Sequence, residues 1–187
     1  MTTLNKNLTC TTDKTFRGYP IQTEKGSLVE HYLQKCYLTL QQALKAYPRT
    51  FALRVDLRIP AETTYVPHNV ISEFSEQLNR IIARDRLRAK RSSKHASDSE
   101  LRYVWVRERS TANQDHYHLV LFLNWDAYSS LGNRKATEGN MAARITKAWA
   151  NALGLLFEDA RDGVHFPKNS CYKVCADDRE SQADLFY

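Results

Sequence analysis

The feature that most constrains this chain is residues 51–59, where apolar and charged side chains alternate. Every odd-numbered position is apolar, whereas three of the even-numbered ones are charged: Arg54, Asp56 and Arg58. Successive side chains of a strand point to opposite faces of a sheet. The segment is therefore predicted to be a strand with one buried face and one charged face.

Periodic segments elsewhere give the order of the other elements. Helical spacing predicts helices over residues 28–47, which Pro48 ends, from His68 or Asn69 onward, and over 141–153, which Gly154 ends. Strand patterns cover 101–109 and 116–124, with a turn over 110–115 between them. Short extended segments at 164–166 and 171–174 follow, and 177–187 starts a last helix.

From residue 51 the predicted order is strand, helix, strand, strand, helix, strand. This is an α+β arrangement, the RRM/ferredoxin-like split βαβ antiparallel sheet, here with an additional N-terminal helix. Both helices of that plan lie on one face of the sheet, so we expect the other face to be free as a working surface. Residues 1–26 show no periodicity and are interpreted as an N-terminal arm, with residues 27–187 as the domain.

Composition narrows the functional classes. The chain has 187 residues, no apolar run of the ~18 residues that a membrane span needs, and a polar start over residues 1–15, so we expect a cytoplasmic protein. The formal net charge of +6 suits a polyanionic partner, although a generic basic surface gives the same balance. The four cysteines are expected to be free thiols. Cys171 and Cys175 hint at zinc, but two ordinary small hydrophobic residues explain them better.

Two histidines carry the strongest chemical signal. His116 and His118 are two apart on a predicted strand, so both imidazoles lie on the same face, and imidazole is the commonest neutral metal ligand. Glu108, on the neighbouring strand, would complete a set that suits Mn²⁺ or Mg²⁺. Sharing that face requires Glu108 to pair with an even-numbered residue such as His116. The alternatives are two surface histidines and an exposed carboxylate.

Two groups of charged residues are candidates for DNA binding. Arg54, Asp56 and Arg58 would line the same open face as the histidines if their strand lies beside the histidine strand. Seven cations between Arg80 and Lys94 form a basic tail to the second helix, of which we select Arg84, Arg88 and Arg91. Such charges can neutralise phosphates, although charge runs are often simply solvated.

The ordered set of Phe51–Ile59, Glu108, His116 and His118 resembles the HUH endonucleases, which include rolling-circle replication initiators and relaxases. It is most similar to the replication-initiator-like family of filamentous phages (inoviruses) and cryptic prophages (YagK/YfjJ C-terminal domain-like). Residues 162–167, Asp-Gly-Val-His-Phe-Pro, and the ending Asp-Leu-Phe-Tyr187 also look like that family. The resemblance covers residues 27–187.

The resemblance implies an RRM-like sheet with His116, His118 and Glu108 as ligands of a metal that polarises a phosphate of single-stranded or origin hairpin DNA. A tyrosine would attack the phosphorus and remain joined to the 5′ end. In that family the nucleophile tends to lie in a Tyr-x-x-Lys-like motif past the Asp-Leu-Phe-Tyr segment, where this sequence stops. The domain is therefore expected to be truncated, with Tyr187 and Tyr172 as substitute candidates.

Three hypotheses follow from these residues. The first is a rolling-circle replication initiator of a bacterial host cell, which nicks single-stranded DNA when a nucleophile is present. The second is a catalytically inactive DNA-binding or regulatory module on the same scaffold, because the tyrosine motif is expected to be missing from the chain. The third is a protein-interaction domain with incidental histidines. The sequence leaves the oligomeric state open.

Overall fold

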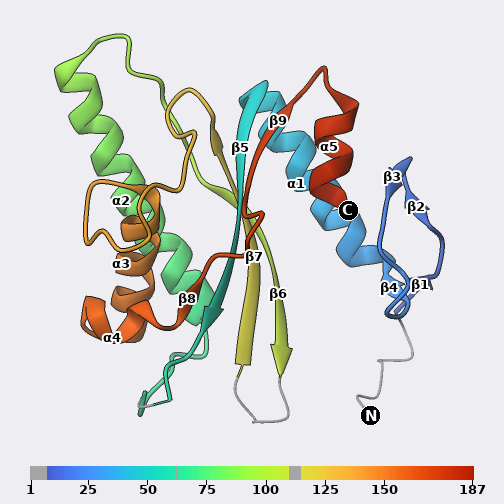
Figure 1. Ribbon diagram of the computed structural model, residues 1–187, viewed down its shortest axis with the longest axis horizontal. Helices are drawn as coiled ribbons and strands as arrows, with labels where there is room; N and C mark the ends of the chain where they lie inside the picture. Colours follow the sequence, from blue (N-terminus) through green and yellow to red (C-terminus); the bar gives the residue numbers. More distant parts are fainter. Residues whose placement is uncertain (1–7, 62, 110–114) are drawn as a thin grey trace.

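A computed structural model describes residues 8–61, 63–109 and 115–187 of the chain (Figure 1). The main elements are α1 (Glu30–Ala46), β5 (Arg49–Arg58), α2 (Val70–Ser92), β6 (Arg102–Arg109), β7 (Asp115–Asn124), α3 (Met141–Leu153), β9 (Cys171–Cys175) and α5 (Arg179–Phe186). The short ones are β1 (Cys10–Thr11), β2 (Thr15–Phe16), β3 (Tyr19–Pro20), β4 (Leu28–Val29), α4 (Phe157–Arg161) and β8 (Val164–His165). The predicted α+β class with antiparallel strands is confirmed, and so is the additional N-terminal helix.

Most predicted elements appear close to their expected positions. The helix α3 ends where Gly154 adopts φ 67°, the left-handed conformation that a glycine accepts without strain. Helix α4 was not predicted, and of the turn expected over residues 110–115 only Asp115, the first residue of β7, lies within the described residues. The first seven residues of the predicted arm also lie outside them. In the described ranges no helix has both the length and the hydropathy to cross a bilayer.

The main sheet has the strand order β6-β7-β5-β8, with β9 also pairing with β5. All of these pairings are antiparallel. β5 therefore lies in the centre: β7 occupies one of its edges along the whole strand, and β8 and β9 share the other. Residues from the middle and from the last quarter of the chain thus meet across β5.

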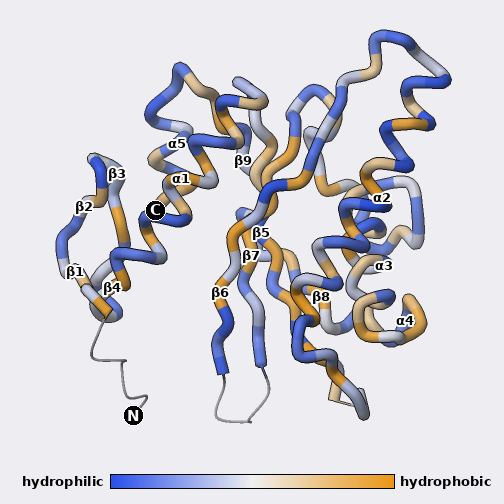
Figure 2. Tube along the Cα trace, turned by 180° about the vertical axis from the view of Figure 1, so that it is seen from behind, coloured by the Kyte–Doolittle hydropathy of each residue, from blue (hydrophilic) through white to orange (hydrophobic). Residues whose placement is uncertain are grey.

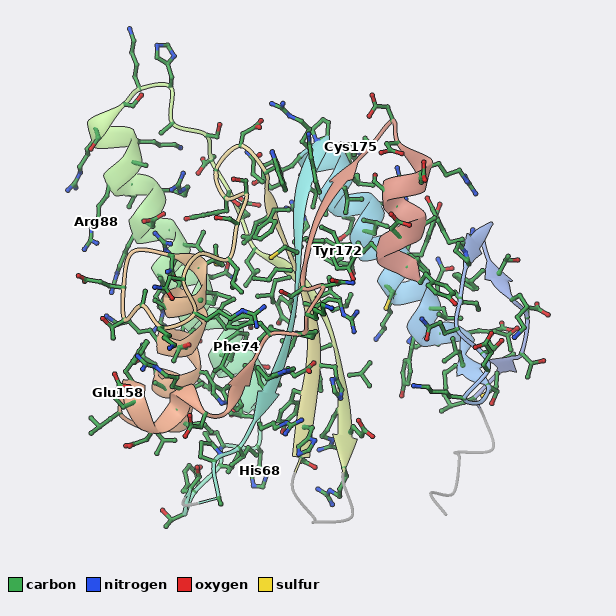
Figure 3. All side chains as sticks on the ribbon, viewed as in Figure 1. His68, Phe74, Arg88, Glu158, Tyr172 and Cys175 are labelled. Carbon is green, nitrogen blue, oxygen red and sulfur yellow. The ribbon has the colours of Figure 1, made fainter. Side chains whose placement is uncertain are left out.

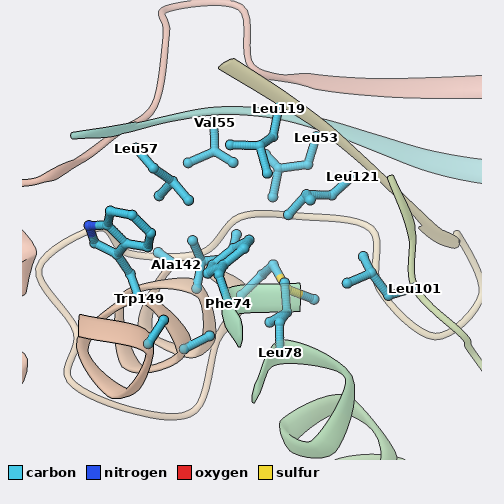
Figure 4. Packing of buried hydrophobic residues seen from close by; sticks show 14 of the residues in the cluster. Leu53, Val55, Leu57, Phe74, Leu78, Leu101, Leu119, Leu121, Ala142 and Trp149 are labelled. Carbon is cyan, nitrogen blue, oxygen red and sulfur yellow. The ribbon is translucent and has the colours of Figure 1, made fainter. Parts of the chain in front are cut away.

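The larger core lies between one face of this sheet and the helices α2 and α3. The odd-numbered residues of β5 and β7 are buried there against side chains such as Phe74, Leu78 and Trp149 (Figure 4). Phe74 and Trp149 meet edge to face, with ring centroids 6.0 Å apart. The indole N–H of Trp149 donates to the backbone carbonyl of Arg58 at 3.0 Å, so this buried polar group is satisfied.

The opposite face is only partly free, which corrects the expectation of an open surface. Helices α1 and α5 lie on it (Figure 1) and bury Ala52, Phe122 and Val174 in a second, smaller core. They cover the half of the face near the start of β5, where Ala52 of β5 and Val120 and Phe122 of β7 provide apolar side chains at even-numbered positions. Toward the end of β5 the even-numbered positions become charged, and Figure 2 shows β6 and β7 hydrophilic at the corresponding ends. Among the described residues, only this half remains open.

The described part of the segment before α1 is folded against the C-terminal helix. Tyr19 and Ile21 are buried, and the Tyr19 hydroxyl donates to Gln182 Oε1 at 2.6 Å. The Tyr19 ring also stacks on Phe186, with centroids 5.1 Å apart. These contacts hold α5 against the covered half of the sheet.

A charged cluster around Asp85 joins three segments of the helical layer. Asp85 in α2 accepts hydrogen bonds from Arg144 of α3 at 2.6 Å, from Arg86 at 2.7 Å and from the hydroxyl of Tyr128, which follows β7, at 2.7 Å. Burial acts to raise the pKa of Asp85, but these three hydrogen bonds outweigh it and lower the pKa to about 2. The carboxylate therefore stays ionised and fixes α2 relative to α3.

We expect Asp85→Asn to lower the free energy of unfolding by about 1–3 kcal/mol at pH 7, since two partly buried guanidinium groups lose their counter-ion. Because the folded-state pKa is depressed, this contribution is present above pH ~4 and is lost as the pH falls toward the folded value. Urea denaturation followed by circular dichroism at pH 7, 5 and 3 measures it. Asp177→Asn, at an exposed position, is the matched control; an equal effect of both variants would contradict the account.

Candidate metal centre

Strand register brings the predicted ligands onto one open face. In β6 and β7, Glu108 lies directly opposite His116, which is the pairing that a shared face requires. His116 is paired on its other side with Arg58 of β5, and His118 with Asp56. The three proposed ligands and the charged residues of β5 therefore occupy three successive cross-strand rows of the same face. These rows lie on the half of the sheet that α1 and α5 leave open.

His118 lies at the centre of this group and contacts two carboxylates. Its Nδ1 is 2.8 Å from Asp56 Oδ1, and its Nε2 is 3.0 Å from Glu108 Oε2. A neutral imidazole has only one N–H, so donating to both carboxylates requires the doubly protonated ring. The arrangement holds the ring between two strands, with one nitrogen toward β5 and the other toward β6.

Asp56 is the residue that connects His118 to a third histidine. Its second oxygen, Oδ2, lies 3.2 Å from Nδ1 of His165, which is paired with it in β8. The Asp56 side chain is only 19% exposed, whereas that of His118 is 46% exposed. Asp56, predicted as a DNA-contacting residue, is thus occupied by two imidazoles.

His165 was not among the residues predicted for the site. It belongs to the segment Asp162–Pro167, for which the sequence offers only the family resemblance. Nothing in a single histidine 109 residues away from Asp56 indicates the contact. It depends on β8 pairing with β5.

A close backbone approach positions β8. Arg58 N–H donates to the carbonyl of Gly163 at 2.7 Å, and a Cβ added to Gly163 would collide with the Arg58 carbonyl oxygen. That same carbonyl accepts the Trp149 N–H. Only glycine fits between β5 and the core here, which fixes where the next residues, including His165, begin to pair.

The electrostatics follow from these contacts. Burial acts to lower the pKa of His118, but the hydrogen bonds to Asp56 and Glu108 outweigh it and raise the pKa above its ordinary value. Burial acts to raise the pKa of Asp56, and the hydrogen bonds from His118 and His165 reverse this and lower it. Without a metal ion, these contacts favour the positively charged, doubly protonated form of His118.

The donor set fits a divalent cation in its chemistry. Two imidazoles and a carboxylate are suitable ligands for Mn²⁺, and two neighbouring donors of an octahedral ion with bonds of ~2.1 Å lie about 3.0 Å apart. This equals the 3.0 Å between His118 Nε2 and Glu108 Oε2. Across the described ranges, no group of three or more His, Cys, Asp or Glu side chains is already arranged to hold a metal ion. Binding therefore requires these side chains to rotate and His118 to lose a proton.

The predicted DNA-binding arginines lie on both sides of the sheet. Arg54 and Arg58 are exposed on the open face. Arg54 also lines a hollow of about 770 Å³ that contains Arg134, Lys168 and both candidate tyrosines, Tyr172 and Tyr187. In contrast, Arg84, Arg88 and Arg91 belong to α2, on the opposite side of the sheet.

The candidate tyrosines differ in their distance from the histidines. Tyr172 is half-buried on β9 opposite Ala52, four residues along β5 from Asp56, or roughly 13 Å at the rise of a strand. Figure 3 shows its side chain on the side of the sheet where α5 lies. Tyr187 is 63% exposed at the edge of the same hollow.

A third tyrosine corrects the expectation that the tyrosine motif is missing from the chain. Residues 32–35 read Tyr-Leu-Gln-Lys, a Tyr-x-x-Lys motif that begins at the third residue of α1. Tyr32 is 50% exposed. Its neighbour Leu33 lines an apolar groove with Val104 and Val120. These two valines form a cross-strand pair, and the next pair on the same face is Val106 with His118. The motif is present in the sequence ahead of the histidines, whereas the family resemblance places it past the Asp-Leu-Phe-Tyr segment.

Comparisons with known proteins agree on one family. Residues 11–186 match the YagK/YfjJ C-terminal domain. The uncharacterized protein YfjJ of Escherichia coli K12 is 32% identical over 162 residues, 80% of this chain and 77% of YfjJ. The uncharacterized protein YagK of the same strain is 36% identical over 146 residues, 73% of this chain and 67% of YagK. No solved structure matches the chain. The YagK/YfjJ part of the predicted resemblance is confirmed, and its link to HUH endonucleases stays a prediction.

We expect an NMR titration of the metal-free protein to give His118 a pKa above ~6.5, and Asp56→Asn to lower it. The contribution of a raised histidine pKa to stability is present below pH ~6.5 and is lost as the pH rises through the folded value. That of Asp56, whose pKa is lowered, is present above pH ~4 and is lost as the pH falls. Asp162→Asn removes the same charge at an exposed position and should leave the titration unchanged. A His118 pKa that does not respond to Asp56→Asn would refute the contact.

Proposed function

The chain belongs to the YagK/YfjJ C-terminal domain family, and from the site that its fold assembles we propose that it binds single-stranded DNA with the help of Mn²⁺ or Mg²⁺. We further propose that it acts as a rolling-circle replication initiator-like endonuclease in the cytoplasm of a bacterial host cell. The observation that carries the proposal is the cross-strand assembly of Glu108, His116 and His118 on the open half of the sheet. The strand order β6-β7-β5-β8 supports the finer description of this sheet as ferredoxin-like.

In this proposal each residue has a distinct task. His116, His118 and Glu108 hold the cation, which when bound supplies polarisation of a phosphate oxygen. Asp56 fixes the ring of His118 through Nδ1 so that Nε2 is directed toward Glu108, and His165 in turn fixes Asp56. Such carboxylate–histidine contacts orient metal-binding imidazoles in other proteins.

The DNA strand would follow the charged side of β5. Arg54 and Arg58 are exposed beside Asp56 and can neutralise the phosphates that flank the reacting one. The hollow next to Arg54 has room for a nucleotide, with Arg134 and Lys168 for a phosphate and Tyr172 for stacking. This places the strand across the open face rather than along the helices.

Three tyrosines are candidates for the nucleophile. Tyr172 and Tyr187 line the hollow. Tyr32 is exposed on α1, one turn before Cys36, which lines the apolar groove beside Val104 and Val120. Lys35 lies one helical turn from Tyr32. Of the three, Tyr32 combines exposure, a helix and a neighbouring cation, so we rank it first.

A non-catalytic DNA-binding module is the second candidate. It is favoured by the side chains as they stand, because His118 is bonded to two carboxylates and Tyr172 is half-buried away from the histidines. This candidate predicts DNA binding without a covalent product. The experiment below separates the two.

We expect incubation with end-labelled single-stranded DNA and Mn²⁺ to give a covalent protein–DNA band on a denaturing gel. His116→Ala/His118→Ala should abolish the band and Mn²⁺ binding measured by calorimetry, whereas Asp56→Asn should weaken Mn²⁺ binding about 10–100-fold. Tyr32→Phe, Tyr172→Phe and Tyr187→Phe identify the attached residue, since only one of them should remove the band.

His68→Ala/His95→Ala is the matched control, because it removes two exposed histidines away from the site and from the candidate tyrosines and should change neither readout. Normal nicking by the His116/His118 variant would rule out the metal mechanism. Metal-dependent DNA binding without a covalent band in the wild type would leave the non-catalytic module as the function.

A further inference from the structure

The helical layer carries a basic groove on the side of the molecule away from the metal centre. It lies between α2 and α3, has a volume of about 510 Å³, and contains five Arg or Lys side chains against two carboxylates: Arg80, Arg84, Arg88, Arg144 and Lys147 against Asp85 and Glu138. Figure 3 shows Arg88 on the outer side of α2, across the sheet from Tyr172. The site proposed above uses none of these residues.

The groove contains both fixed and exposed cations. Arg144 is held by Asp85, and Arg80 is paired with Glu76 in the preceding helical turn. Arg84, Arg88 and Lys147 are exposed, and no ion pair with another described residue involves them. A partner with negative charge would therefore meet three cations that intramolecular carboxylates do not already neutralise.

The spacing of these cations suits a phosphate backbone. Arg80, Arg84 and Arg88 follow at four-residue intervals, which is about 6 Å per step along a helix. Two nucleotides of one strand of duplex DNA rise about 6.8 Å along its axis. The spacing between successive arginines is therefore close to the axial spacing between every second phosphate. Lys147 of α3 lies across the groove and can reach the same backbone from the other side.

The apolar residues of α2 argue against a membrane surface as the partner. A helix that binds a bilayer presents its apolar face to the lipid. Here the apolar stripe of α2 is buried in the core against the sheet, with Phe74, Leu78 and Ile82 all fully covered. Leu87 is the large apolar side chain that α2 exposes (59%), so a membrane would meet this side of the molecule chiefly through charges, without the apolar face that such binding inserts.

We propose that the α2–α3 groove is a second nucleic-acid site, which holds the phosphate backbone of duplex DNA while the open face of the sheet takes a single strand. The choice of DNA as the polyanion rests on the proposed function, whereas the groove itself does not depend on the metal centre. One molecule would then contact both parts of a junction between duplex and single strand, on opposite sides of its sheet.

The test is the salt dependence of duplex binding by fluorescence anisotropy, with a labelled DNA duplex lacking single-stranded ends. Arg84→Gln/Arg88→Gln/Lys147→Gln should weaken binding to the duplex at least about tenfold. It should also reduce the slope of log K against log salt by about 2–3, close to one unit for each lost phosphate contact. Arg84→Lys/Arg88→Lys keeps the charges and should keep the slope.

Lys25→Gln/Lys35→Gln/Lys45→Gln is the matched control, because it removes three exposed charges from the N-terminal side of the molecule. Equal losses with this control, or an unchanged slope in the groove variant, would overturn the proposal. So would a wild-type protein that does not bind the duplex, or one that binds vesicles containing phosphatidylserine through the same three residues but not the duplex.

The outcome is independent of the metal centre. His116→Ala/His118→Ala should bind the duplex like the wild type, even if it no longer binds a metal ion. A wild-type protein that binds the duplex but neither binds nor nicks single-stranded DNA with Mn²⁺ would count against the proposed function alone, and a wild-type protein that nicks single-stranded DNA but does not bind the duplex would count against the groove alone. The thermal midpoints of the groove variants and of their lysine control should stay within a few degrees of the wild type, since their substituted side chains are exposed.

Discussion

The pairing of β5 with β7 is the interaction on which the rest of the structure depends. Nine consecutive residue pairs, from Thr50–Asn124 to Arg58–His116, fix the register. A shift of one residue would turn every side chain to the other face. The apolar residues that meet α2 and α3 would then be exposed, and His118 would be buried among them. The same hydrophobic burial that stabilises the core therefore determines the position of the candidate ligands.

The sheet also separates two kinds of electrostatic environment. On the open half of one face, Asp56 and Glu108 lie close to the imidazole of His118, so charges of opposite sign are matched at short range. On the helical side, Asp85 matches the charges of Arg86 and Arg144, and the cations further along α2 are left to solvent. One face is suited to a small cation and the other to an extended anion.

Elements defined by local sequence patterns were predicted correctly more often than contacts between residues far apart in the sequence. The alternation over residues 51–59, and Gly154 after a helical stripe, each reflect a periodicity that neighbouring residues reveal, so β5 and α3 were found. The pairing of Glu108 with His116 could be stated as a condition, because it concerns two adjacent strands. The contact of Asp56 with His165 had no such signal. The cover of α1 and α5 over half of the sheet was missed because the plan of the fold alone does not say where extra helices pack.

The position of β8 has a consequence for the order in which the site forms. Asp56, Glu108, His116 and His118 belong to strands that can pair as soon as residue 124 has been synthesised. His165 follows α3 and α4 in the chain, and it joins them only through the pairing of β8 with β5 beside the contact of Gly163 with Arg58. Its contact with Asp56 closes a loop of more than a hundred residues, and such distant contacts form late in folding. A nascent chain thus holds its histidine pair before the second support of Asp56 exists, and the complete hydrogen-bonded set distinguishes the finished fold from its precursors.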